Sequence, residues 1–259
     1  MSAGLGLQVG TLARRSALRT LRQPAMVIPA LFFPLLLLAV NSGGLQETTR
    51  LPGFPTDRYL DFVLAVCFVQ GGLFAANSAG TNMASDVETG FISRLALTPL
   101  RRAALLVGQL AGVVALGLIQ AATFLIAGLL AGAGIEAGVG GALTITALSL
   151  LISLGFGGIG AFVALRTGSG EAVQGIFPLM FAGLFLSSMA LPRDLIESDW
   201  FRVVATWNPV SYMLEGIRSL VITGWDAEAL ALGFGCAGGV ALISLAGASS
   251  ALRTRMVRT

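Results

Sequence analysis

The sequence SDVETGFISRLALTPLRR, residues 85–102, is the longest polar interruption between two runs that are otherwise apolar enough to lie in lipid. We interpret residues 85–99 as a short helix with a defined beginning and end. Ser85 could cap the first backbone amides, and Glu88 could reach back to the Ser85 amide, which is the arrangement called a capping box. Pro99 would end the helix because it lacks an amide hydrogen.

Charge and apolar spacing support this interpretation. Asp86 and Glu88 lie near the positive end of the expected helix dipole, and Arg94 lies toward the other end. Apolar residues recur every four positions from Val87 to Leu95, so they share one face. The stretch therefore predicts an amphipathic helix along the membrane surface that could contact a partner in the water. A solvated loop that is helical by chance fits the pattern equally well.

Composition places the chain in the membrane. Of its 259 residues, 55% are hydrophobic and 11% are charged, and the mean hydropathy is +0.85. Apolar runs of about 20 residues recur, each long enough to cross a bilayer as a helix. We therefore expect an all-α integral membrane protein. Too little polar sequence remains for a separate soluble domain.

The basic residues exclude several classes of function. All 16 are arginine, and the chain has no histidine. Without an imidazole, we expect no metal site and no serine–histidine mechanism. The arginines cluster beside span ends, as orientation signals do, so the basic character does not indicate a nucleic-acid partner. Cys67 and Cys236 fall inside apolar runs, and we interpret them as small buried hydrophobes.

We expect one transmembrane domain over residues 1–259, with about six spans. The expected spans are residues 24–41, 59–84, 103–131, 141–165, 172–191 and 228–250. Residues 1–23 predict an amphipathic helix at the interface, with arginines on one face.

Residues 192–226 are too polar for a plain span and too apolar for an ordinary loop. We predict a pair of short re-entrant helices there. Asn208 followed by Pro209 is a strong helix start, and Glu215 and Arg218 could pair on one face. Eleven of the 16 arginines fall on the side that holds both termini. This asymmetry predicts cytoplasmic termini and re-entrant helices outside the cell.

The sequence lacks both of the common nucleotide-binding motifs. GFGGIG, residues 155–160, spells the dinucleotide fingerprint, but it lies mid-span with no acidic partner downstream, so we reject that interpretation. A phosphate-binding loop of the Walker type needs a lysine, and the chain has none. Any energy for its work must therefore come from a partner.

Two segments carry a family resemblance. DVETGFISRLALTPLRRAALLVGQLAG, residues 86–112, resembles the coupling segment of the type-2 ABC exporter permeases, and NPVSYMLEGIRSLV, residues 208–221, resembles their second signature. Among subfamilies the chain looks closest to the daunorubicin-resistance-type drug-efflux permeases. It departs from many relatives in that only Asp86 and Glu88 precede the coupling glycine.

The resemblance implies two permease copies, as a homodimer or a heterodimer, each with a separate ATP-binding subunit. That subunit would hydrolyse ATP, so the permease itself would have no enzymatic activity and no cofactor. The exporter would sit in a bacterial plasma membrane and move a hydrophobic drug or lipid-like substrate outward. The implied coupling residues are Asp86, Glu88, Thr89, Gly90, Phe91 and Arg94. The implied extracellular gate comprises Asn208, Pro209, Glu215 and Arg218.

The resemblance also implies that the second and fifth spans line the transport path. Candidate polar contacts are Gln70, Asn77 and Gln174, and candidate apolar contacts are Phe177, Phe181 and Phe185. The three phenylalanines recur every four residues, and ordinary helix packing explains that spacing as well.

One alternative function stays open, and two others fit less well. Polysaccharide- or glycolipid-exporting permeases share this architecture. An ion-coupled transporter would want carboxylates within the spans, where the sequence offers little beyond Asp61 near one end. An enzyme acting on lipid would want a clustered polar site at the interface, which is not visible.

Overall fold

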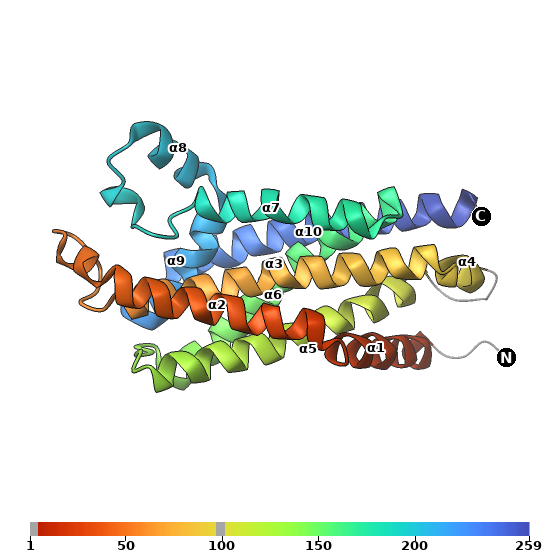
Figure 1. Ribbon diagram of the computed structural model, residues 1–259, viewed down its shortest axis with the longest axis horizontal. Helices are drawn as coiled ribbons and strands as arrows, with labels where there is room; N and C mark the ends of the chain where they lie inside the picture. The colour runs from red at the N-terminus through yellow and green to blue at the C-terminus, as the bar shows by residue number, and fades with distance from the viewer. Residues whose placement is uncertain (1–4, 97–101, 259) are drawn as a thin grey trace.

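The computed structural model describes residues 5–96 and 102–258, which form helices and connecting turns without any strand (Figure 1). The α-helices are α1 (Leu5–Leu21), α2 (Pro24–Gly44), α3 (Tyr59–Glu88), α4 (Phe91–Ala96), α5 (Arg102–Leu130), α6 (Gly138–Thr167), α7 (Gly170–Phe185), α8 (Asp199–Trp207), α9 (Pro209–Ile222) and α10 (Ala227–Arg258). The 3-10 turns are η1 (Gln46–Arg50) and η2 (Arg193–Leu195).

Within the described part of the chain, 5 helices are long and apolar enough to cross a bilayer, namely α2, α3, α5, α6 and α10. The span expected at residues 172–191 is shorter, because α7 has 16 residues and ends at Phe185. At about 1.5 Å per residue it covers about 24 Å, less than the hydrocarbon thickness of about 30 Å. The side-chain amide of Asn208 donates hydrogen bonds to the carbonyls of Gly183 and Leu186, and these bonds supply partners for two carbonyls at the end of α7.

Helix α3 is the centre of the bundle. Most of its residues are buried, as in a helix surrounded by others, and it packs against α2, α5, α6, α7 and α9. Figure 1 shows it running most of the length of the molecule. Both ends of this helix carry the polar sites described below.

The glycines of the GFGGIG segment bring α6 close to its neighbours. An added Cβ would lie 2.0 Å from the Ala76 carbonyl oxygen at Gly160 and 2.4 Å from the Ser244 hydroxyl at Gly158. At Gly155 it would lie 3.2 Å from the backbone nitrogen of Ala241. The segment therefore allows α3 and α10 to pack tightly on α6, in the way that small residues do in membranes.

Helix α2 contains Pro29 and Pro34. A proline leaves the carbonyl four residues earlier without its usual helical donor. For Pro34 that carbonyl belongs to Ala30, and it accepts a 3.3 Å hydrogen bond from the side-chain amide of Gln120 on α5. A neighbouring helix thus satisfies the broken bond, as the lipid environment requires.

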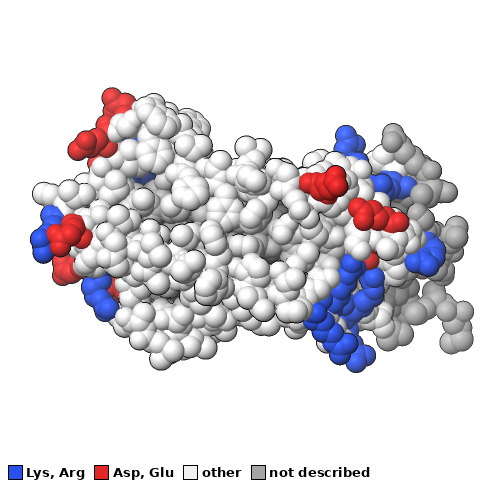
Figure 2. Space-filling view, viewed as in Figure 1, with Lys and Arg blue, Asp and Glu red and all other residues white. Residues whose placement is uncertain are grey.

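Charged side chains gather at the two ends of the bundle and leave an apolar band between them (Figure 2). We call the end that holds both chain termini and α4 the terminal end, and the end that holds η1 and α8 the far end (Figure 1). Helix α9 crosses the far end. Its beginning is bonded to the end of α7 through Asn208, and its last turn accepts hydrogen bonds from Glu136 and Ala137 in the α5–α6 turn.

Candidate functional site

The helix expected over residues 85–99 is wrong in its boundaries. Helix α3 continues to Glu88, so Ser85 lies inside it and forms no capping box. Gly90 adopts φ 68°, a left-handed conformation that glycine tolerates. The chain turns at this residue before α4 begins at Phe91. The Thr89 hydroxyl donates a 2.7 Å hydrogen bond to the carbonyl of Ser85 and completes the turn. Residues 97–99 of the expected helix lie outside the described residues.

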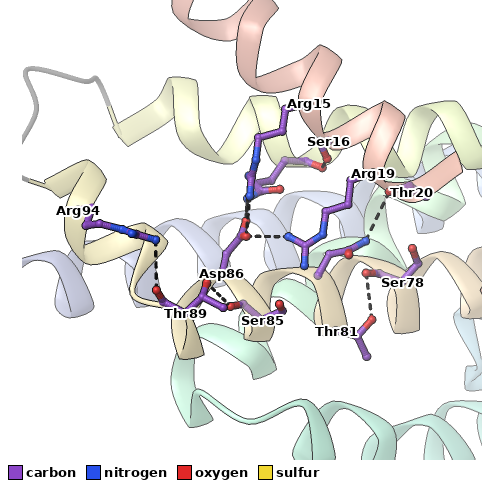
Figure 3. A network of polar contacts seen from close by, with 12 residues as sticks. Arg15, Ser16, Arg19, Thr20, Ser78, Thr81, Ser85, Asp86, Thr89 and Arg94 are labelled. Atoms are coloured by element: carbon purple, nitrogen blue, oxygen red, sulfur yellow. Dashed lines mark hydrogen bonds and ion pairs between the residues drawn. The ribbon is translucent and has the colours of Figure 1, made fainter. Parts of the chain in front are cut away.

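The structure turns Asp86 inward, where α1 meets it (Figure 3). Arg15 donates from both terminal nitrogens to its two carboxylate oxygens, at 3.0 and 3.3 Å, and Arg19 donates at 2.7 Å. The side-chain amide of Gln109 on α5 also donates to the carboxylate. We call these four residues the Asp86 cluster. Asp86 is 2% exposed, so its charge is stable there only because all these donors surround it.

Close packing of α1 on α5 brings the arginines into reach. An added Cβ would lie 2.4 Å from the Leu12 Cβ at Gly108 and 2.6 Å from the Thr20 hydroxyl at Gly112. Ser16 donates a 2.7 Å hydrogen bond to the Gln109 carbonyl across the same contact. The packing and the Asp86 cluster together hold α1, α3 and α5 as one unit at the terminal end.

The other coupling candidates lie at or near the surface around this unit. Glu88, Thr89 and Arg94 are exposed, and Gly90 and Phe91 are half-buried. Arg94 donates a 3.3 Å hydrogen bond to the Thr89 carbonyl, and the Arg15 guanidinium lies 3.9 Å from the centre of the Phe91 ring. The Glu88 carboxylate accepts a 3.3 Å hydrogen bond from the Gly170 amide, which links the end of α3 to the start of α7.

At the far end, Arg218 of α9 is nearly buried, with 5% of its surface exposed. It donates to three backbone carbonyls: from Nε to Phe62 at 3.0 Å, and from its terminal nitrogens to Ser188 at 2.6 Å and Met189 at 2.8 Å. Its guanidinium also lies 3.6 Å from the centre of the Phe62 ring. Burial lowers the pKa of Arg218 to about 9, against the opposing charge of Glu215, so the side chain stays charged at neutral pH.

The expected pair of Glu215 with Arg218 is wrong as a direct contact. Glu215 forms its ion pair with Arg193, at 2.6 Å, and accepts a 3.3 Å hydrogen bond from the Ser188 hydroxyl. The carbonyls beyond α7 occupy the donors of Arg218 instead. A cavity of about 410 Å³ lies beside these groups, and Arg193, Glu215 and Arg218 all line it.

The start of α9 is confirmed. Asn208 accepts a 3.0 Å hydrogen bond from the Val210 amide and so caps the helix, and Pro209 occupies its first position. The same asparagine bonds the end of α7, so one side chain joins the two helix ends.

Between the two ends, α2, α3 and α7 share a cluster of aromatic rings. Phe177 and Phe181 of α7 lie 5.4 and 6.2 Å from Phe74 of α3, and Phe33 of α2 lies 6.0 Å from Phe181. These distances suit edge-to-face packing.

The other path candidates divide into two kinds. Gln70 is 1% exposed, and neither of its amide atoms has a hydrogen-bond partner among the described residues. The side-chain oxygen of Asn77, two turns along the same face of α3, lacks a partner there as well. Gln174 and Phe185 instead are exposed on the surface of α7.

Sequence reasoning missed Arg15, Arg19, Gln109 and Arg193 as site residues. The sequence does carry a signal for two of them: Arg15 and Arg19 are four residues apart on one helical face, and Asp86 is the first acidic residue after a long apolar run. For Gln109 and Arg193 the sequence carries no comparable pattern.

The architecture is that of a multi-pass membrane protein whose polar groups sit at the two ends of an apolar bundle. Comparison with known proteins defines it further, because residues 7–222 match the family described as ABC-2 type transporter. The chain therefore belongs to the ABC-2 type transporter family. Permeases of this family are generally non-catalytic, and in general they work as dimers with an ATP-binding partner.

Similar proteins carry a matching description. "Putative transport permease ycf38" of Porphyra purpurea is 26% identical over 222 residues, which cover 85% of this chain and 76% of that protein. The protein of the same name from Cyanophora paradoxa is 26% identical over 211 residues, which cover 81% and 72% respectively. Neither name refers to drug efflux or to the daunorubicin-resistance type.

Proposed function

We propose that this chain is the membrane-spanning subunit of an exporter that a separate ATP-binding subunit powers. Two copies would pair, each with its own ATP-binding subunit, and would move a hydrophobic drug or lipid-like substrate out of the cell. The terminal end would lie in the cytoplasm, since the excess of arginine on that side supports this orientation. The family membership and the lack of any lysine support a partner as the source of energy.

The Asp86 cluster is the observation that carries the proposal. It lies next to the turn after α3, where Glu88 and Thr89 are exposed, and to α4, where Arg94 is exposed. A partner that docks on the turn would push a unit in which α1, α3 and α5 are already joined. In this proposal Asp86 holds α1 in place, and the exposed residues of the turn and α4 contact the partner.

The transport path would run between α3 and α7, next to α2. Phe74, Phe177 and Phe181 offer ring faces to an apolar substrate. Gln70 offers an amide group, and Asn77 a side-chain oxygen, to which no described residue is bonded. An unbonded buried amide is costly, and a passing polar group or water would relieve that cost. Gln174 and Phe185 lie at the rim of this path in the proposal.

Helix α9 would close the path at the far end. Arg218 ties it to α3 and to the segment after α7, and the pair of Glu215 with Arg193 adds a second tie. Opening of the path at this end would require these hydrogen bonds and the ion pair to break together. We therefore assign Asn208, Pro209, Glu215 and Arg218 to the gate.

Ion-coupled transport has little support. No acidic residue occurs at positions 62–85, 102–135, 137–170 or 229–258, which hold the central parts of α3, α5, α6 and α10. A carrier driven by protons or sodium ions would need such groups within the membrane.

The docking surface can be tested by charge reversal. We expect the double variant Glu88→Arg with Arg94→Glu to lose binding to a co-expressed ATP-binding subunit in a detergent pull-down. Both side chains are exposed, so the variant should keep the melting temperature of the unmodified protein.

Arg253→Glu serves as the matched control, because Arg253 is also exposed at the terminal end but lies on α10. This variant should bind the ATP-binding subunit normally. Unchanged pull-down of the double variant, with the control also unchanged, would show that the docking surface lies elsewhere.

A further inference from the structure

Helix α8 has an apolar face that no described residue covers. Trp200 is 67% exposed and Trp207 is 84% exposed, and Val203 and Val204 between them are exposed as well. At 100° per residue these four side chains fall on one side of the helix. Large contiguous apolar surfaces in contact with water are rare and usually mark an interaction site.

The protein fixes the direction in which this face points. Ala205, on the opposite side of α8, is fully buried. The Tyr212 hydroxyl donates a 2.9 Å hydrogen bond to the Thr206 carbonyl, which holds the end of α8 against α9. The tryptophan face is therefore directed away from the bundle, and Figure 1 shows α8 standing out at the far end.

A third tryptophan lies at the same end, beyond the other end of α9. Trp225 is 62% exposed, and an added Cβ at Gly140 would lie 3.2 Å from its ring. The chain contains 3 tryptophans in all, so every one of them lies at the far end with most of its surface exposed. Tryptophan is enriched where membrane meets water, because its ring is apolar and its N–H needs a polar partner.

We propose that α8 lies flat in the headgroup region of the leaflet at the far end, with Trp200, Val203, Val204 and Trp207 inserted among the lipids. The apolar face continues onto the exposed end of α7, because Asn208, which follows Trp207, is bonded to Leu186. Phe185 and Leu186 there are also exposed. Lipid is therefore the partner that covers both surfaces without a break.

The charges on the polar edge of α8 indicate which kind of lipid the helix needs for insertion. Asp199 and Arg202 form an ion pair along that edge, so the helix presents no net charge to the headgroups. Its insertion depends on apolar burial and the indole rings, and a zwitterionic bilayer provides both. The helix lies in the interface and does not dip into the membrane, which differs from the re-entrant pair expected from the sequence.

Tryptophan fluorescence tests this position directly. The full chain with Trp225→Phe, which keeps only Trp200 and Trp207, is placed in zwitterionic vesicles whose lipids carry bromine at a shallow or a deep acyl position. We expect shallow bromine to remove most of the emission, deep bromine to remove less, and aqueous iodide to have little effect. The matched control has all three tryptophans replaced by phenylalanine and Asp57→Trp in the exposed loop before α3, and iodide should quench it.

Two outcomes would overturn the proposal. Quenching by iodide but not by bromine would place α8 in water. Quenching by neither would show that protein covers the face, such as a second copy of this chain. The inference needs only that the chain lies in a bilayer, so the experiment uses no ATP-binding subunit, and its failure would leave the proposed export function untouched.

Discussion

At the scale of single residues, Asp86 shows how a charge can be stable at the edge of a membrane. Its carboxylate accepts hydrogen bonds from Arg15, Arg19 and Gln109, and so both oxygens are satisfied. Charge-assisted bonds of this kind are stronger than neutral ones, and they offset the cost of burial. The two arginines also remain partly exposed, so their own desolvation is incomplete.

We expect Asp86→Asn to destabilise the docking of α1. Removing one partner of a buried ion pair costs about 3–5 kcal/mol, and we expect about 2 kcal/mol here because water can still reach both arginines. The variant should melt at a lower temperature in detergent, and trypsin should cut the arginines of α1 faster.

Glu47→Gln is the control for Asp86→Asn. It breaks a 2.6 Å ion pair with Arg50 whose side chains are both largely exposed, so its effect should stay between about 0 and 1 kcal/mol. Equal melting temperatures for the two variants would contradict a structural role of the Asp86 cluster.

At the scale of elements, the sequence predicted the helices well where hydrophobic length decides them. The expected spans at residues 24–41, 59–84, 103–131, 141–165 and 228–250 correspond to α2, α3, α5, α6 and α10. The cap of α9 at Asn208 was also predictable, because capping depends on neighbouring residues.

The boundaries that failed depend on contacts between distant residues. Helix α3 continues past Ser85 because its next residue, Asp86, finds partners on α1 and α5. Glu215 and Arg218 were expected to pair because they are three residues apart, but Arg193 and the carbonyls after α7 take up their bonds. Backbone carbonyls leave no trace in a sequence, so such partners cannot be inferred from residue types.

The close contact of α6 with α3 leads to a test of helix packing. Gly160→Ala would place a methyl group 2.0 Å from the Ala76 carbonyl oxygen, and backbone cannot move aside as a flexible side chain can. We expect a loss of about 1–3 kcal/mol, measured as a lower melting temperature in detergent.

Gly239→Ala on α10 is the matched change, since an added Cβ there meets no heavy atom within 4 Å. Alanine favours helix over glycine by about 0.5–1 kcal/mol, so this variant should be as stable as the unmodified protein or more so. If Gly160→Ala melted like Gly239→Ala, the tight packing of α3 on α6 would be refuted.

At the scale of the whole molecule, the distribution of charge predicts an orientation in the membrane. Figure 2 shows charged groups at both ends and none across the band between them. The terminal end holds the larger share of the arginines, and this bias predicts that it faces the cytoplasm.

Cysteine labelling can check this orientation. Cys67 and Cys236 are first replaced by alanine, and single cysteines are then introduced as Asp57→Cys at the far end and Thr254→Cys at the terminal end, both at exposed positions. In intact cells a membrane-impermeant maleimide should label position 57 and spare position 254. The reverse pattern would place the termini outside and would also remove the proposed docking surface from the cytoplasm.

The length and continuity of α3 bear on how its two ends are connected. It is a single run of 30 residues without a proline, about 45 Å long, and it ends at Glu88 on one side while carrying Phe62 near the other. Such a helix resists compression along its axis, so its two ends are expected to move together. In the proposed exporter, a displacement of Glu88 along the helix axis would therefore reach the Phe62 ring and carbonyl that hold Arg218, and would loosen that contact at the far end.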